Sequence, residues 1–287
     1  IMISANLVNI AGNYILIYGK FGLPALGVVG AGISTLTARI LMFVAFAVLF
    51  YRNLRYRRYL VGYKRGKYNF TDILSLNKMG WMVGLQMGLE TALFSITGIM
   101  IGWLGSIALA AHQVMLTVSQ LFYMVYYGMG AAVAVRVSYF SGQGDTAAVR
   151  ATAAAGFRII LLIACVVAVP IFMLRGQLSL WFTDSREVCS LVAAAVVPLI
   201  AYQFGDGLQC TFANALRGIL DVKIMMLYSF IAYFIISLSA SYLFGFIMNG
   251  GLPGIWMAFP LGLTSAGIMF CLRFLYKTRK TASAQTL

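Results

Sequence analysis

Eight long apolar runs dominate this sequence and constrain its fold more than any other feature. Each run is near or above the roughly 20 residues that an α-helix needs to cross a bilayer. They lack the period of two that marks a β-barrel strand, so helices are the predicted spanning elements. Only 10% of the residues are charged, against about 25% in soluble domains, which predicts an all-α integral membrane protein. The expected spans are residues 1–19, 23–50, 80–104, 108–135, 153–174, 188–216, 222–248 and 253–276.

Basic residues divide the connections between these spans into two sets. Most of the 21 Lys and Arg residues lie on one side, whereas Lys20, Arg175 and Arg186 lie on the other. The basic segments are 51–79, 136–158, 217–223 and 273–280. Because Lys- and Arg-rich loops stay in the cytoplasm, we predict a multi-pass protein of the cell membrane with both ends of this chain on the cytoplasmic side.

The basic run at 51–67, YRNLRYRRYLVGYKRGK, also mixes basic and aromatic residues. Such a mixture can bind nucleic acid. In a chain with many spans, topology and attraction to anionic lipid explain it better, so we expect the lipid bilayer and no nucleic acid as a partner. Residues 69–81, NFTDILSLNKMGW, are expected to form a short surface helix before the third span.

A weak internal repeat suggests a larger architecture. The segment GLPALGVVGAGI at 22–33 is similar to GLPGIWMAFPLG at 251–262, and six expected spans lie in that interval. Parallel six-helix repeats are a common transporter plan. The chain opens at Ile1 inside an apolar run, without the features of a signal peptide. We therefore expect a twelve-helix protein of which this chain lacks the first four spans.

Two carboxylates lie inside predicted spans, where an unpaired charge is costly and indicates function. Asp206 is 11 residues before Arg217, and Glu90 is 12 residues after Lys78. At 1.5 Å per residue, both lie about 17 Å along their helices from the cytoplasmic flank. Two carboxylates at one depth could share a cavity, although the sequence does not show whether their helices are neighbours.

Polar residues accompany both carboxylates at helical spacing, and a further polar stripe follows on the fourth span. Lipid would reject such stripes, so they are expected to face the bundle, either as hydrogen-bonding contacts between helices or as a cavity lining. The carboxylates themselves favour function, because contacts between helices do not need an ionisable group. The candidate lining residues are Gln86, Phe94, Gln113, Gln120, Tyr127 and Gln209.

The chemistry expected of such carboxylates is exchange of a cation. A buried carboxyl can bind H⁺ or Na⁺ from one side and release it when water or another cation arrives. Glu90 and Asp206 would be the ligands if the ion is Na⁺, and the ring of Tyr202, one turn from Asp206, could face a cation. No other cofactor is expected, because the four cysteines lie far apart and there is one histidine, His112. We expect His112 to be a structural or interface residue.

The sequence resembles the multidrug and toxic compound extrusion (MATE) transporters. The stretches that carry the resemblance are NYILIYGKFGLPALGVVGAGIST, GLETALFSITGIMIGWLGSIALAAHQ, GMGAAVAVRVSYFSGQGD and DGLQCTFANALRGILDVK. The resemblance implies a two-lobed, twelve-helix fold with a central cleft and antiport of amphipathic or cationic organic compounds against H⁺ or Na⁺. Residues 1–50 would be the last two helices of the amino-terminal lobe, 51–79 a cytoplasmic linker, and 80–287 the carboxyl-terminal lobe.

Within that family, Glu90, Asp206 and Tyr202 match the cation-coupling positions of the NorM-type branch. The membrane Asp of the family's first helix is absent, so the missing amino-terminal helices would be partners of this chain. Two alternatives stay open. A lipid-linked oligosaccharide flippase of the same superfamily would have a cationic cavity, yet Arg39 is the one basic residue inside an expected span. An intramembrane aspartyl protease would fit Gly205–Asp206, but Gln203 stands where its motif has glycine.

Overall fold

The computed structural model describes residues 1–22, 24–53, 56, 60–62, 66 and 69–285, and it is helical at the predicted spans. Six described helices are long and apolar enough to cross a membrane, and a pair of helices bent by 50° passes the same test when its two members are taken together. The chain is an integral multi-pass membrane protein. Much of the predicted basic linker, including Arg55, Arg57, Arg58, Lys64, Arg65 and Lys67, lies outside the described residues.

The chain divides into two units, Ile1–Asp72 and Ile73–Leu287. The first contains a helical hairpin of α1 (Met2–Tyr18) and α2 (Gly27–Arg52). Two small residues allow the helices to approach: Ser34 Oγ donates to the Asn9 carbonyl at 2.9 Å, and a Cβ on Gly30 would lie 2.6 Å from the Leu16 carbonyl oxygen. With 17 residues, α1 is shorter than a typical span.

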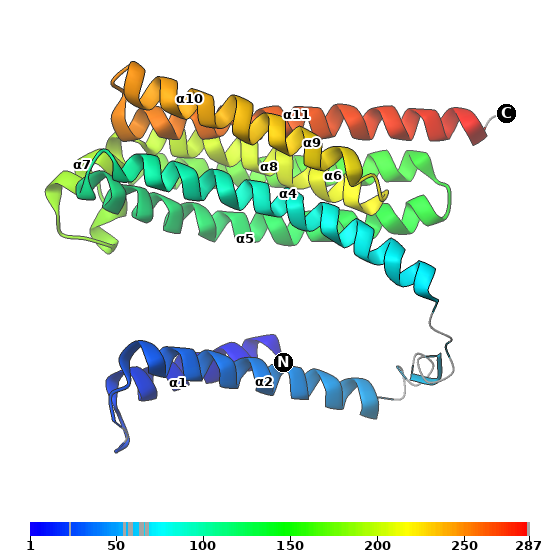
Figure 1. Ribbon diagram of the computed structural model, residues 1–287, viewed down its shortest axis with the longest axis horizontal. Helices are drawn as coiled ribbons and strands as arrows, with labels where there is room; N and C mark the ends of the chain where they lie inside the picture. The colour runs from blue at the N-terminus through cyan, green and yellow to red at the C-terminus, as the bar shows by residue number, and fades with distance from the viewer. Residues whose placement is uncertain (23, 54–55, 57–59, 63–65, 67–68, 286–287) are drawn as a thin grey trace. The chain divides into compact units, whose positions relative to one another are not determined.

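The second unit is a helical bundle (Figure 1). Its long helices are α4 (Phe70–Gly102), α5 (Ser106–Gly142), α6 (Thr146–Met173), α8 (Val196–Gly218) and α11 (Gly251–Gln285). Shorter segments are the 3₁₀ turn η2 (Leu178–Trp181), α7 (Arg186–Ala194), α9 (Lys223–Phe230), η3 (Ile231–Leu238), α10 (Ser239–Tyr242) and η4 (Leu243–Ile247). The start of α4, the α5–α6 turn, the α8–α9 turn and the end of α11 lie at one end of this bundle (Figure 1). These parts of the chain contain the predicted basic segments, and the predicted topology requires them to lie at the same end of the bundle.

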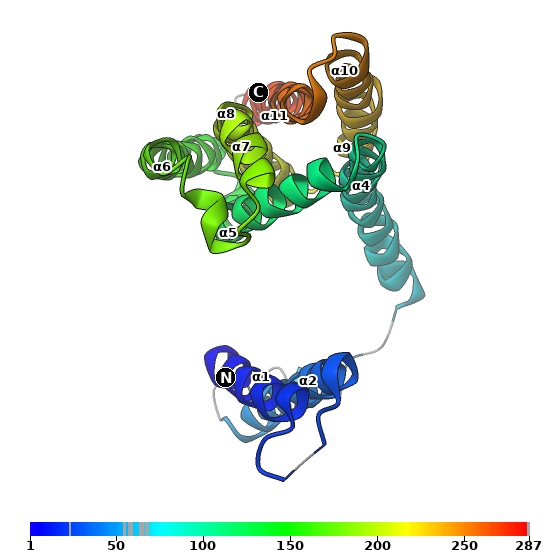
Figure 2. The ribbon, with the colours of Figure 1, turned by 90° about the vertical axis from the view of Figure 1, so that its left-hand side faces the viewer.

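Helix α8 is the centre of this unit, packed against α5, α6 and α11 (Figure 2). Glycines make the close packing possible. A Cβ on Gly207 would lie 2.7 Å from a methyl group of Ile160 in α6, and one on Gly205 would lie 2.8 Å from Oγ1 of Thr264 in α11. Small residues serve this purpose in membrane helices because lipid offers no hydrophobic drive for association. Most of α8, including Asp206, is therefore buried.

Two predicted elements need correction. The span expected at 188–216 is two helices, α7 and α8, bent by 50° at Ala195. Pro198 explains the break, because it has no N–H to donate to the carbonyl of Ala194. The surface helix expected at 69–81 is instead the first part of α4, which continues without interruption from Phe70 to Gly102. Over 33 residues α4 is about 50 Å long, so it extends beyond a hydrocarbon core of about 30 Å.

The span formed by α9, η3, α10 and η4 contains two π-helical segments, Ile231–Leu238 and Leu243–Ile247. Such segments are rare and occur often at functional sites. The first of them carries the buried Tyr233. The internal repeat also has a structural counterpart: Gly22 and Gly251, which the repeat aligns, both adopt a positive φ, of 83° and 55°.

Candidate functional site

The two carboxylates predicted from the sequence line one small pocket. Its volume is about 20 Å³, slightly more than the roughly 10–15 Å³ that holds a single water molecule. The lining residues are Gln86, Met87, Glu90, Tyr123, Tyr127, Asp206, Gln209, Cys210, Ala213, Asn214 and Arg217. We call this the carboxylate pocket. Helices α4 and α8 thus bring Glu90 and Asp206 together, as their equal depth suggested.

Glu90 is held by two amide groups from different helices. Its Oε2 accepts a hydrogen bond from Nε2 of Gln209 at 3.1 Å and one from Nε2 of Gln86 at 3.3 Å. Tyr233 in the π-helical segment lies near this carboxylate, but its hydroxyl has no hydrogen-bond partner among the described residues. Hydrogen bonds to charged groups are stronger than those between neutral groups, so these amides are placed to stabilise an ionised Glu90.

Asp206 is more deeply buried, with 1% of its surface exposed. Among the described residues, no hydrogen-bond partner reaches its Oδ2. Oε1 of Gln209 likewise has none. An ionised carboxylate is costly to bury without a partner. Carboxylate and amide oxygens suit a hard cation such as Na⁺, and a carboxylate can equally accept H⁺. Glu90, Asp206 and Gln209 therefore form a donor set that fits either ion.

Arg217 is a member of this pocket that the sequence analysis placed only at the helix flank. Its Nη2 donates to Oε1 of Gln86 at 2.7 Å, and its Nη1 donates to Oδ1 of Asn214 at 3.3 Å. A signal for this position existed: Arg217 follows Asp206 by 11 residues, which is close to three full turns and the same helix face.

A much larger cleft of about 790 Å³ lies beside the carboxylate pocket. Its walls come mainly from α4 and α5, with Tyr202 from α8. The lining residues are Met87, Glu90, Thr91, Phe94, Ser95, Gly98, Leu109, His112, Gln113, Leu116, Thr117, Ser119, Gln120, Leu121, Tyr123, Met124 and Tyr202. Glu90 and Tyr123 belong to both cavities, so occupancy of the carboxylate pocket can change the wall of the cleft. The volume is within the range of drug-sized ligand sites.

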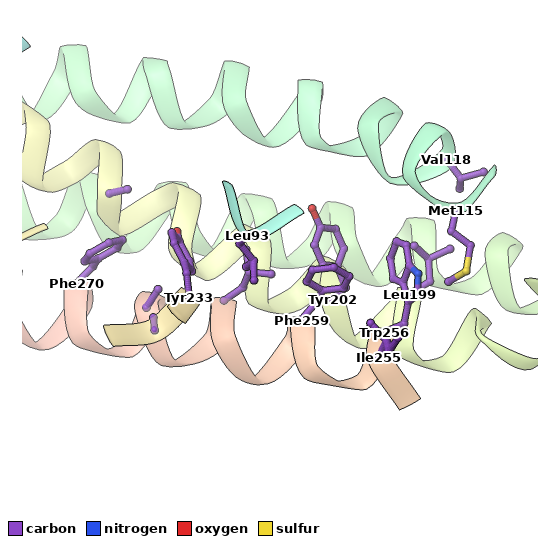
Figure 3. Packing of buried hydrophobic residues seen from close by; sticks show 14 of the residues in the cluster. Leu93, Met115, Val118, Leu199, Tyr202, Tyr233, Ile255, Trp256, Phe259 and Phe270 are labelled. Carbon is purple, nitrogen blue, oxygen red and sulfur yellow. The ribbon is translucent and has the colours of Figure 1, made fainter. Parts of the chain in front are cut away.

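Two aromatic side chains that line this cleft, Phe94 and Tyr202, belong to a larger buried aromatic cluster. Tyr202 packs edge-on against Phe94, Trp256 and Phe259, with ring centroids 6.0–6.3 Å apart. Phe94 also stacks on Phe259 at 5.0 Å. Figure 3 shows Tyr202, Phe259 and Trp256 close together in the core. Trp256 and Phe259 on α11 were not identified from the sequence, because nothing local links them to residues on α4.

His112 joins α5 to this aromatic cluster. It is 2% exposed, and its Nδ1 accepts a hydrogen bond from Nε1 of Trp256 at 3.2 Å. Since a tryptophan N–H can only donate, Nδ1 must be unprotonated, and the proton of the neutral ring is then on Nε2. His112 is thus an interface residue, as expected, and it also borders the cleft.

The six residues predicted to line a cavity divide between the cleft and the carboxylate pocket. Phe94, Gln113 and Gln120 border the cleft. Gln86, Gln209 and Tyr127 border the carboxylate pocket, because they lie nearer the end of the bundle that carries the basic segments. Gln113 and Gln120 are exposed within this unit and border the cleft, so of the two expected roles they have the position of a cavity lining and not that of buried contacts between helices.

The remaining acidic residues have structural explanations where the structure shows their contacts. Asp145 is the N-cap of α6 and accepts from the amide of Ala148 at 2.8 Å. Asp221, after α8, accepts from Nε of Arg273 at 2.7 Å. In the described part of the chain, no three His, Cys, Asp or Glu side chains form a cluster suited to a transition-metal or multivalent ion.

Comparison with solved structures shows the same fold in several transporters. The eukaryotic MATE transporter AtDTX14 matches with a TM-score of 0.84 at 19% identity, over 98% of this chain and 63% of that one. A multidrug resistance MATE family transporter of the MOP superfamily, in an outward-facing conformation, matches with 0.81 at 18% identity, over 98% and 62%. A MOP superfamily transporter from Pyrococcus furiosus matches with 0.80 at 18% identity, also over 98% and 62%.

These coverages mean that the chain spans less than two thirds of the length of those solved transporters. The family model named MatE matches residues 83–243, which is more than half of the chain and includes both carboxylates. The chain therefore belongs to the MatE family of membrane transporters.

Proposed function

We propose that this chain forms the cation-coupling half of an exporter that drives amphipathic or cationic organic compounds across the cell membrane in exchange for H⁺ or Na⁺. The observation that carries the proposal is the position of Glu90. It contributes to the carboxylate pocket together with Asp206 and also to the wall of the large cleft. A group that borders both cavities can couple the binding of an ion in one to the release of a substrate from the other.

The cleft supports cationic or neutral amphipathic substrates. Glu90 is the one acidic side chain that borders it among the described residues, Lys and Arg do not border it there, and aromatic and methionine side chains form much of its surface. Aromatic faces attract organic cations, and methionine adapts to ligands of different shape. A lipid-linked oligosaccharide is anionic and would gain nothing from this lining.

The polarity of such a cavity is informative in this superfamily. For the Pyrococcus furiosus transporter, reverse polarity of the binding pocket suggests a different function. An acidic pocket in the present chain is the arrangement expected of the NorM-type branch, with Glu90 and Asp206 as the coupling carboxylates and Tyr202 beside them. We propose that residues 80–287 form one lobe, with residues 1–50 part of the other, and that helices outside this chain complete the opposite wall of the cleft.

In the proposed exchange, a cation from outside enters the carboxylate pocket and cancels one of the two negative charges of Glu90 and Asp206. The cleft then loses the charge that held a cationic substrate, and the substrate leaves. When the site opens to the cytoplasm, the cation departs, and the ionised carboxylates can bind the next substrate. The amide donors of Gln86 and Gln209 stabilise this ionised state.

The test is export by the full-length protein in proteoliposomes, with tetraphenylphosphonium as the probe. A Na⁺ gradient and a pH gradient are imposed separately. One of the two should drive export, and both Glu90→Gln and Asp206→Asn should reduce it by at least tenfold. Glu187→Gln, which changes an exposed carboxylate at the start of α7, is the matched control and should have no effect. Export that is undiminished in both pocket variants would rule out the mechanism.

A further inference from the structure

Arg217 lies closer to the carboxylates than a residue at a helix flank needs to. Its guanidinium is partly buried at the end of α8 and donates to Gln86 on α4 and to Asn214 one turn back on α8. Its Nε is also buried and has no hydrogen-bond partner among the described residues. A partly buried arginine whose Nε has no partner among the described residues requires an explanation.

Gln86 connects this guanidinium to Glu90. The same amide accepts from Arg217 through Oε1, at 2.7 Å, and donates to Oε2 of Glu90 through Nε2, at 3.3 Å. The amide dipole is therefore aligned between a positive and a negative group. Both ends of Gln86 are used, and the side chain is 1% exposed, so the alignment is fixed by packing as well as by hydrogen bonds.

We propose that Arg217 is a resident counter-charge that sets the affinity of the carboxylate pocket for the coupling cation. Arginine keeps its charge at every physiological pH. Its positive charge therefore stabilises the ionised carboxylates whenever the cation has left and opposes the cation when it arrives. The inference rests on the proposed function and adds a positioning residue to it. A pocket without this charge would bind its cation too tightly to release it in each cycle.

Other charged and titratable groups surround the same site, and Arg217 is the permanent cation among those that line it. Glu90 comes from α4, Tyr123 and Tyr127 from α5, and Asp206 and Cys210 from α8. Tyr202 of α8 borders the adjacent cleft, and Tyr233 of η3 approaches Glu90. None of these groups carries a positive charge, so replacement of Arg217 changes the sum of charges around the pocket in one known direction.

A simpler role for Arg217 is to complement the carboxyl-terminal end of the α8 dipole or to retain this end in the cytoplasm. The two roles make different predictions. Loss of a capping or topology residue lowers stability or expression without an increase in cation affinity. Loss of a counter-charge makes the cation bind more tightly.

The experiment measures, for the full-length protein in proteoliposomes, the concentration of the coupling cation that gives half-maximal export of tetraphenylphosphonium. Arg217→Gln should lower this concentration by about tenfold, as expected for one charge removed at close range in a partly buried site. Arg217→Lys keeps the charge and should stay within about twofold of the parent protein. Arg273→Gln removes an arginine at the same end of the bundle that pairs with Asp221, and it should leave the value unchanged.

An unchanged or higher half-saturating concentration in Arg217→Gln overturns the inference. If that variant does not accumulate, Gln86→Glu replaces it: the new carboxylate pairs with Arg217 and cancels its charge, and it should also lower the value. An unchanged or higher half-saturating concentration in Gln86→Glu would also overturn the inference. The proposed function is tested independently, because it fails when Glu90→Gln leaves driven export intact, whatever the Arg217 variants show.

Discussion

Gln209 and Glu90 are 119 residues apart in the chain, and the amide of the first donates a 3.1 Å hydrogen bond to the carboxylate of the second. This contact joins α8 to α4 at the level of both cavities. It also leaves Oε1 of Gln209 without a protein partner among the described residues, beside Asp206. One amide thus supports one carboxylate and offers an oxygen ligand to an ion bound by both.

Gln209→Leu is expected to weaken coupling. The substitution removes the Oε1 ligand that Gln209 offers to a bound cation, an interaction with a charged group worth about 1.5–3 kcal/mol, or roughly a tenfold to hundredfold weaker binding of that cation. Export at a subsaturating cation gradient should fall by at least tenfold. The control is Gln203→Leu, a buried glutamine on the same helix whose amide has no partner among the described residues. Equal losses in both variants would show that the effect is one of packing.

Trp256→Phe is expected to destabilise the protein by about 1–2 kcal/mol. The change removes the donor to Nδ1 of His112, a hydrogen bond worth about 1 kcal/mol, and shrinks a fully buried side chain. Thermal unfolding of the detergent-solubilised protein measures the loss. Trp103→Phe alters a tryptophan that is 68% exposed and should change the midpoint by less than a third as much. A stable Trp256→Phe would mean that His112 has another partner.

Gly130→Ala should separate α5 from α8. A Cβ at this position would lie 2.5 Å from Nδ2 of Asn214 and 3.0 Å from Sγ of Cys210. Overpacking of this kind is destabilising by about 1–3 kcal/mol. Gly128→Ala, on the same helix with open space around it, should be neutral or slightly stabilising, because alanine favours the helix. The pair is compared by unfolding temperature in the same detergent, and a neutral Gly130→Ala would contradict the close approach.

The Asp221–Arg273 pair is expected to contribute modestly to stability. Its two hydrogen bonds, at 2.7 and 3.3 Å, join the turn after α8 to α11. Partial exposure of both side chains limits such a pair to about 1 kcal/mol or less. A double-mutant cycle with Asp221→Asn and Arg273→Gln should give a coupling energy of that size that decreases as salt is raised. A coupling energy of zero at low salt would show that the two side chains lie close together without stabilising the fold.

The sequence alone was sufficient to determine the class of fold and the chemically unusual residues. Apolar runs longer than a bilayer must be helical, because lipid satisfies no backbone hydrogen bond. The cost of placing polar groups in lipid also identifies Glu90 and Asp206 as unusual, since a carboxylate at that depth is expensive and indicates a function. Helical rise placed both at one depth, and the structure brings both to one pocket.

Only the tertiary structure decided which helices are neighbours. Local periodicity reports which face of a helix is polar, but it contains no information about the helix that this face meets. The contacts of Arg217 with Gln86 and of His112 with Trp256 join residues 131 and 144 positions apart. They depend on long side chains that join α4 to α8 and on the packing of α5 and α11 against the glycine-lined surface of α8. For the same reason, the sequence predicted two carboxylates and a polar stripe, whereas the division into a carboxylate pocket and an adjoining cleft required the folded bundle.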